Sequence, residues 1–396
     1  MKDTRNFIVL SAIAINFALT MTMVVPMLPL YASSLGATTF GVGLLVAATP
    51  LCAIFFEIPI GASASHIGLT RLMKWAFLTG AASGILFAVA STPLMLIVPQ
   101  VIFGLTLGLF FPQLISYYYR ISTRADRQAM QGYNTAFQGV GFMAGPMVAG
   151  VIGHYQGLQW VFIWYTILSL CGYLLCQHLR PLDRTEPTEV GPFYKVAHAS
   201  FRQALSLVRT EKGLRTSIVF VALMVTLWQG LGNTIFPLYI EDRYAQIAMM
   251  VGTLIAVREF GSIIFRVLFG RICRFISLPG VLSISIALMA IGNLIIPRVH
   301  EPLAIAFACL VVGLGSGALA PGINLMALDA VPETQGSLGM AICSTSSRIG
   351  LLITAPLLGG MAETYGFGST FTVTSILCIA IVALFVLWDR FSWSPS

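Results

Sequence analysis

Charged side chains are scarce in this chain of 396 residues, of which they make up 9%, whereas a soluble domain carries roughly a quarter. The one long polar stretch of the sequence covers residues 179–215, where prolines and basic residues gather. This composition excludes a protein whose surface mostly faces water. Hydrophobic residues make up 57% and the mean hydropathy is +0.87, so we expect most of the surface to face lipid.

The sequence also lacks the motifs of enzyme chemistry. It contains no phosphate-binding loop of the Walker type, no nucleophile elbow and no metal-ligand spacing. Its seven cysteines are odd in number and follow no spacing typical of zinc or of a disulfide framework, so we interpret them as small core residues. We therefore expect no enzyme activity, no catalytic residues, no metal and no cofactor.

Apolar stretches of about twenty residues recur along the whole chain. Each is long enough to cross a hydrocarbon layer of roughly 30 Å. Each is continuously apolar rather than alternating, which indicates helices and not barrel strands. We predict twelve membrane-spanning helices over residues 7–31, 38–61, 72–91, 95–118, 130–153, 158–178, 216–240, 246–269, 278–297, 302–326, 336–361 and 367–388.

The second half of the chain repeats landmarks of the first at an almost constant distance. The triplet that begins at Pro29 returns at Pro237, 208 residues later, and Pro146 returns as Pro356, 210 residues later. Matches with so little drift indicate duplication of a unit of six helices. We predict an all-α membrane protein with twelve transmembrane helices in two parallel-repeated six-helix bundles, with bundles at 1–178 and 216–396 and a cytoplasmic linker at 179–215.

The formal net charge of +7 comes from basic loops on one side of the predicted membrane. With twelve spans both chain ends lie on the same side, and most of the 22 lysines and arginines fall there. By the positive-inside rule both termini are cytoplasmic. We expect a multi-pass protein of the inner (plasma) membrane whose basic loops also contact lipid headgroups. Because this asymmetry accounts for the charge, nucleic acid is not an expected partner.

Three charged residues are expected at mid-depth in the membrane: Arg258 and Glu259 in the span 246–269, and Arg348 in the span 336–361. Ionised groups at this depth are costly and usually face a polar cavity or pair with one another. One interpretation is that an arginine binds an electronegative group of a substrate while Glu259 exchanges protons. The other is a purely structural pair of Arg348 and Glu259. Residues 258 and 259 point about 100° apart on a helix, so we do not expect both to face a cavity.

Polar and aromatic residues also cluster in the middle of the span 216–240. Trp228, Gln229 and Asn233 combine an aromatic ring with amides, which suits an amphipathic organic ligand. Core packing explains the ring equally well. Glu57, near the cytoplasmic end of its span, is either a gating and proton-coupling residue or an interfacial charge that reaches water.

The fifth predicted span contains the pattern Gly141-x-x-x-Gly145-Pro146-x-x-x-Gly150. Such glycines leave bare backbone on one helix face, and Pro146 bends the helix by removing a backbone donor. With twelve spans in repeated halves and a basic linker, the chain resembles the major facilitator superfamily over essentially its whole length. This pattern resembles the motif of the drug:proton antiporter branch. The resemblance implies a multidrug-efflux type of transporter that exposes a mid-membrane site alternately to each side, and it gives the motif residues a conformational role.

The superfamily also has a loop signature, G-x-x-x-D-R-x-G-R-R, between its second and third spans. Here the matching segment begins at Gly61 and contains Gly68 and Arg71, while Ser65 and His66 replace the acid and the first arginine. The resemblance therefore implies a gating role for Gly61, Gly68 and Arg71. The charge relay of the family signature does not carry over.

Two further positions depart from the pattern of that branch. Its members typically have an arginine in the fourth span where this chain has Gln100, and many have a carboxylate in the first span. The first span here offers Asn16, Thr20 and Thr22, of which we assign Asn16 to the substrate site. These departures concern proton coupling and leave the fold unaffected.

Together these features predict a monomeric secondary transporter that exports a small organic molecule, anionic or amphipathic, in exchange for protons. An uptake symporter or facilitator, or a translocase for a lipid or lipid precursor, would share the fold. Outside transport, the alternative is a sensor or a membrane-embedded enzyme. A cavity closed to both sides, or a buried nucleophile–base pair, would indicate that class.

Overall fold

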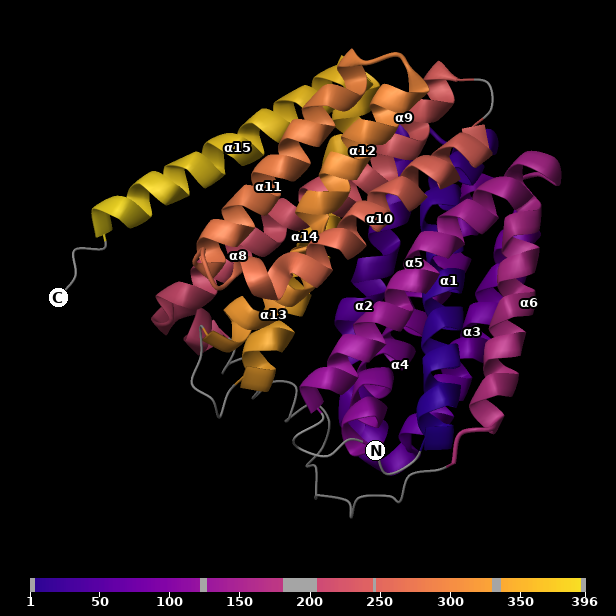
Figure 1. Cartoon of the computed structure of the whole chain (residues 1–396). Coiled ribbons are helices and arrows are strands. Elements are labelled where there is room, and N and C mark those ends of the chain that lie inside the picture. The colour runs from indigo at the N-terminus through magenta and orange to yellow at the C-terminus, as the bar shows by residue number, and fades with distance from the viewer. Residues whose placement is uncertain (1–3, 122–126, 181–204, 245–246, 330–335, 393–396) are drawn as a thin grey trace. The chain divides into compact units, whose positions relative to one another are not determined.

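The computed structural model describes residues 4–121, 127–180, 205–244, 247–329 and 336–392, and within these ranges the chain forms helices and no strand. The α-helices are α1 (Thr4–Ser34), α2 (Thr39–Ile67), α3 (Leu69–Ala88), α4 (Ile97–Ile121), α5 (Arg127–Tyr155), α6 (Leu158–Gln177), α8 (Lys212–Val225), α9 (Phe236–Arg243), α10 (Ile247–Ile272), α11 (Leu278–Ile295), α12 (Pro302–Ser316), α13 (Leu319–Asp329), α14 (Gly336–Tyr365) and α15 (Phe367–Ser392) (Figure 1). Short 3₁₀ helices are η1 (Pro93–Leu96) and η3 (Ile296–Arg298), and η2 (Thr226–Ile235) is a π-helix.

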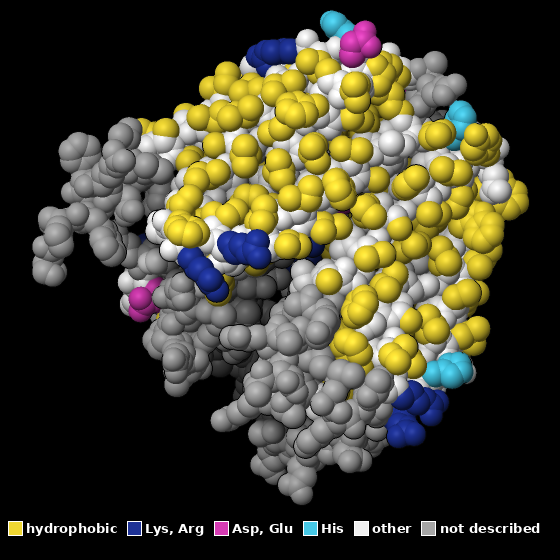
Figure 2. Space-filling view, viewed as in Figure 1, with side chains coloured by type: hydrophobic (Ala, Val, Ile, Leu, Met, Phe, Trp, Pro, Cys, Tyr) yellow, Lys and Arg dark blue, Asp and Glu magenta, His cyan; other side chains and the backbone are white. Residues whose placement is uncertain are grey.

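Each predicted span has a helical counterpart. The seventh is built from α8, η2 and α9, and the tenth from α12 and α13. Of the described helical stretches, ten are long and apolar enough to cross a membrane, and Thr39–Leu51 is a shorter apolar helix. Figure 2 shows a face covered mostly by hydrophobic side chains, with few charged ones among the described residues. The predicted all-α membrane fold is confirmed.

Contacts among the helices divide the chain into two compact units. The first comprises Met1–Arg202 with Ile240–Ala256, and the second comprises Gln203–Tyr239 with Val257–Ser396. The division thus passes through α9 and α10 as well as near the expected linker. The domain limits at 178 and 216 stay a prediction.

Both units contain the same tyrosine contact, as a duplicated sequence would require. In the first unit the hydroxyl of Tyr31 donates to a backbone carbonyl just after α3 at 3.0 Å, and its ring lies 4.9 Å from that of Phe162. In the second unit Tyr239 donates to a carbonyl just after α11 at 3.4 Å, and its ring lies 5.6 Å from that of Phe371. The sequence separations are 208 residues for the tyrosines and 209 for the phenylalanines. The repeated landmarks therefore make equivalent contacts in the two units.

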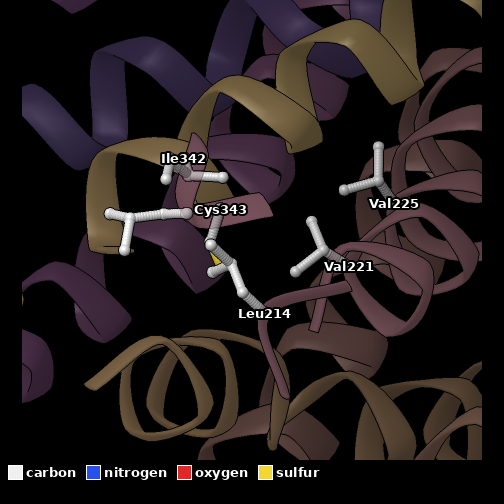
Figure 3. Packing of buried hydrophobic residues seen from close by; sticks show 6 residues of the cluster. Leu214, Val221, Val225, Ile342 and Cys343 are labelled. Carbon is white, nitrogen blue, oxygen red and sulfur yellow. The ribbon is translucent and has the colours of Figure 1, made fainter. Parts of the chain in front are cut away.

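Packing of the second unit includes a close contact between α8 and α14. Leu214, Val221 and Val225 lie seven and four residues apart, which places them on one face of α8. They pack against Ile342 and Cys343 of α14 (Figure 3). In lipid, helices associate through such close packing and not through removal of apolar surface from water. This contact fixes α8, and with it the segment that leads into η2.

Candidate functional site

The first two glycines of the motif in α5 lie against α1 within the first unit. A Cβ added at Gly141 would come 2.5 Å from the carbonyl oxygen of Ile15, and one at Gly145 would overlap Oγ1 of Thr22. The hydroxyl of Thr22 donates to the carbonyl of Ala18 at 2.8 Å and reaches the carbonyl of Gly141 at 3.3 Å. The bare face of α5 therefore admits α1 at backbone contact distance, as the glycine spacing predicts.

The end of the motif contacts the start of α10, in the same unit. A Cβ at Gly150 would come 2.6 Å from the carbonyl oxygen of Ala248, and Gly252 lies directly against the carbonyl of Pro146. Pro146 is inside α5, which continues to Tyr155. The motif thus forms a contact face for two helices, and its conformational role is a proposal taken up below.

The loop signature lies at the turn between α2 and α3. Gly68 has φ 95°, a left-handed conformation that side chains with a Cβ rarely adopt, so glycine is needed at this turn. Arg71 follows in the first turn of α3 and is exposed. Glu57 and Gly61 belong to a part of α2 whose side chains lie outside the described residues.

In the second unit, a buried polar cluster surrounds Arg258 of α10. Arg258 is 4% exposed and Glu259 is 5% exposed. Nη2 of Arg258 lies 3.3 Å from Oε1 of Glu259 and donates to Oδ1 of Asn233 at 2.6 Å. Nη1 donates to the backbone carbonyl of Gly232 at 2.8 Å. Both residues of the α10 pair therefore belong to one cluster, although adjacent helical positions were expected to point apart.

An aromatic ring adds to this cluster from η2. Cζ of Arg258 lies 6.0 Å from the centroid of the Trp228 ring, within the range of a cation–π interaction. Nε of Arg258 and Nε1 of Trp228 are buried and have no hydrogen-bond partner among the residues that the structure describes. A buried N–H group without an acceptor costs about 1–3 kcal/mol. The cluster therefore contains two buried donors without an acceptor among the described residues.

Trp228, Gln229 and Asn233 all lie on η2 and are half-buried. In a π-helix hydrogen bonds join residues five apart. Such segments are rare in proteins, and those that occur often lie at functional sites. The hydroxyl of Thr234 follows the same register, because it donates to the carbonyl of Gln229 at 3.1 Å. This segment was not predicted from the sequence; the available signal was Pro237, which closely follows two glycines.

The remaining predicted residues are more dispersed. Arg348 is half-buried on α14 in the second unit, while Asn16 is half-buried on α1 in the first, where its Oδ1 is buried without a partner. Gln100, at the position where the antiporter branch has an arginine, is 3% exposed. Over the described ranges, no three His, Cys, Asp or Glu side chains come together in a way that would hold a metal.

Comparison with known proteins finds similar transporters. The family model described as Major Facilitator Superfamily matches residues 10–274 and 220–395. Multidrug resistance protein 1 of Bacillus subtilis is 21% identical over 392 residues, which cover 98% of this chain and 97% of that protein. Multidrug resistance protein MdtG of Enterobacter lignolyticus is 25% identical over 374 residues, covering 90% and 86%. Quinolone resistance protein NorA of Staphylococcus aureus is 23% identical over 346 residues, covering 85% and 84%.

Solved structures of transporters share the fold. The crystal structure of the nucleoside transporter NupG matches with a TM-score of 0.81 at 13% identity, covering 99% of this chain and 100% of that one. A POT family transporter in complex with 5-aminolevulinic acid matches with a TM-score of 0.80 at 13% identity, covering 99% and 98%. At these identities the likeness concerns the fold alone, and it agrees with the all-α membrane fold predicted from the sequence.

Proposed function

Because the chain belongs to the major facilitator superfamily, we propose that this multi-pass membrane transporter exports a small organic molecule in exchange for protons, by alternating access. The observation that carries the proposal is the buried cluster of Arg258, Glu259, Asn233 and Trp228 in an apolar unit. Ionisable groups in membrane helices usually serve transport or proton transfer. Relatives named for multidrug and quinolone resistance support export.

The chemistry of the cluster favours an amphipathic substrate with an electronegative group. The unpartnered N–H groups of Arg258 and Trp228 suit a carboxylate or carbonyl oxygen. The indole ring offers an apolar face to the organic body of the substrate. Gln229, half-buried next to Trp228 in the sequence, adds an amide, and we propose Arg348 of the same unit as a further polar group. Asn16, in the first unit, is proposed as a substrate-binding residue on its sequence position alone.

Proton coupling is proposed to act through Glu259, with Glu57 as a second proton-coupling residue. In the ionised form Glu259 pairs with Arg258. A substrate that places a hydrogen-bond donor or a positive group at Glu259 requires the ionised carboxylate, so binding excludes the proton, which is the requirement of antiport. A purely anionic substrate would instead take Arg258 away from Glu259 and draw a proton onto the carboxylate. Proton uptake on substrate binding, in place of proton release, would indicate co-transport.

Conformational change is proposed to use the glycine motif of α5, which consists of Gly141, Gly145, Pro146 and Gly150. The residues of the loop signature, Gly61 in α2, Gly68 at the turn and Arg71 in α3, are proposed as gating residues. We also propose that the protein is a monomer of the inner (plasma) membrane with both termini cytoplasmic. The basic residues of the expected cytoplasmic loops support this orientation.

Flux in proteoliposomes tests the proposal. A quinolone is a suitable probe, since one relative is named for quinolone resistance. We expect an imposed pH gradient to drive the probe in the direction opposite to proton flow, and Glu259→Gln to abolish this pH dependence. Glu301→Gln, which changes an exposed glutamate before α12, is the matched control and should retain it. Probe flux that does not depend on the pH gradient would indicate a facilitator. Probe flux in the same direction as proton flow would indicate a symporter.

A further inference from the structure

Helix η2 leaves one backbone carbonyl without a donor from its own segment. The N–H group of Phe236 donates to the carbonyl of Leu231, five residues earlier. In the same register the carbonyl of Gly232 would accept from residue 237, which is Pro237 and carries no N–H. A buried carbonyl without a donor is costly, so this group needs a partner from outside the helix.

Arg258 of α10 is that partner. Its Nη1 donates to the carbonyl of Gly232 at 2.8 Å, and its Nη2 donates to the side chain of Asn233 at 2.6 Å. A Cβ at residue 232 would come 2.5 Å from Nη1, so glycine is needed for this approach. Glu259 holds the guanidinium through its ion pair at 3.3 Å, and Gly313 of α12 lies directly against the backbone of Arg258. The donor is therefore fixed in place by contacts on both its side chain and its backbone.

The first half of the chain provides an internal comparison. Pro29 is the counterpart of Pro237, yet α1 is α-helical over its whole length and contains no π-helical segment. The positions that correspond to Arg258, 209 and 208 residues earlier, are Thr49 and Pro50, neither of which carries a cation. A proline at this place is thus compatible with an ordinary α-helix. The half that has the arginine is the half that has the π-helix.

We infer that Arg258 is a positioning residue that holds η2 in its π-helical register by hydrogen bonding to the carbonyl of Gly232, and that it thereby sets the orientation of Trp228. Successive helical residues point about 100° apart. If the hydrogen-bond register of η2 changed by one residue, the side chains that precede the change in sequence would turn by about 100° relative to α9. Trp228 and Gln229 are among the side chains that change orientation with the register. This inference goes beyond the proposed export and depends on neither its direction nor its coupling.

The test compares Arg258→Met with the double variant Arg258→Met/Pro237→Ala. Methionine matches much of the length of arginine but donates no hydrogen bond, and alanine at 237 restores the backbone N–H that the carbonyl of Gly232 lacks. Full-length protein labelled with fluorotryptophan in lipid nanodiscs gives a ¹⁹F resonance for Trp228, assigned with Trp228→Phe. Amide hydrogen exchange of residues 226–240 is measured on the same samples. Neither measurement needs a substrate, so failure of the proposed function leaves this test intact.

We expect Arg258→Met to shift the Trp228 resonance and to speed exchange of the segment by about tenfold or more. The double variant should return both signals toward those of the wild type. Arg258→Lys keeps a hydrogen-bond donor, so its signals should lie between those of the wild type and those of Arg258→Met. Pro237→Ala alone should keep the wild-type resonance. An unshifted resonance in Arg258→Met, or a double variant no nearer to the wild type than the single one, would overturn the inference.

Gly232→Ala is a second route that keeps the buried cation. Its Cβ would displace Nη1 from the carbonyl, so the same resonance shift is expected. Should Arg258→Met fail to fold, Gly232→Ala decides the question. A Trp228 resonance that stays at its wild-type position in this variant contradicts the inference.

Discussion

The hydroxyl of Thr22 in α1 lies 3.3 Å from the carbonyl oxygen of Gly141 in α5, close enough to donate a hydrogen bond to it. This distance is possible only because α5 has no side chain at the contact. The glycine at the next turn, Gly145, faces the same threonine. A motif of spaced glycines thereby becomes a measurable contact between two helices.

Gly145→Ala should therefore destabilise the protein. The added Cβ would overlap Oγ1 of Thr22 and come 2.5 Å from the carbonyl oxygen of Leu19. Overpacking of this kind costs about 1–3 kcal/mol. We expect a lower Tm in detergent and slower transport. Gly270→Ala is the matched control, since nothing lies within 4 Å of a Cβ there. Equal Tm values for the two variants would contradict the contact.

Proton release on substrate binding should depend on Glu259. When a zwitterionic quinolone is added to weakly buffered purified protein at a pH where Glu259 carries a proton, we expect that proton to appear in solution, because the bound substrate requires the ionised carboxylate. Glu259→Gln should abolish the release, and Glu301→Gln should preserve it. A pH-sensitive dye reads the change. Proton uptake in place of release would argue for co-transport.

Trp228→Phe should weaken binding of substrates that carry a carboxylate. The variant keeps an aromatic ring and removes the Nε1–H group, which has no partner in the described part of the chain. A hydrogen bond of this kind contributes about 0.5–1.5 kcal/mol, so we expect a twofold to roughly tenfold higher Kd by calorimetry. The methyl ester of the same quinolone provides the comparison. If ester and acid lose equal affinity, the indole N–H does not bind the carboxylate.

Tyr31→Phe and Tyr239→Phe should have similar and additive effects on stability. Each removes a hydroxyl that donates to a backbone carbonyl, at Ala90 and Ile296 respectively. We expect a loss of about 0.5–1.5 kcal/mol for each variant. The two contacts share no partner, so the double variant should show the sum. Thermal unfolding followed by fluorescence would measure it, and a clear departure from additivity would show that the contacts are coupled.

The membrane-spanning helices were predictable because a continuous apolar run of about twenty residues, coiled as a helix, matches the thickness of the hydrocarbon layer. The prediction of a helix over 158–178 falls within one residue of α6, Leu158–Gln177. Glycine spacing likewise predicted the close face of α5, because a residue without a Cβ has a local steric consequence that does not depend on the rest of the fold. Local rules of this kind transfer directly from sequence to structure.

The π-helical register and the partner of Glu259 were not predictable in the same way. The register of η2 depends on Arg258, which reaches it from another helix. The pairing of Arg258 with Glu259 depends on where the long arginine side chain bends, whereas helical geometry alone suggested that the two point apart. The first feature arises from a contact between helices and the second from a side-chain conformation within α10, and a single sequence specifies neither.

The tyrosine contact found in both units has a consequence for how this chain diverged after its duplication. Each copy has the same tyrosine contact between its first, third and sixth helices, so these helices pack in the same way in both. In the second copy a buried cation, Arg258, donates to a backbone carbonyl of the proline-bearing span, at Gly232. The two copies therefore share this packing contact and differ in the polar groups of their helices. Selection for a new substrate would be expected to act unequally on the two copies.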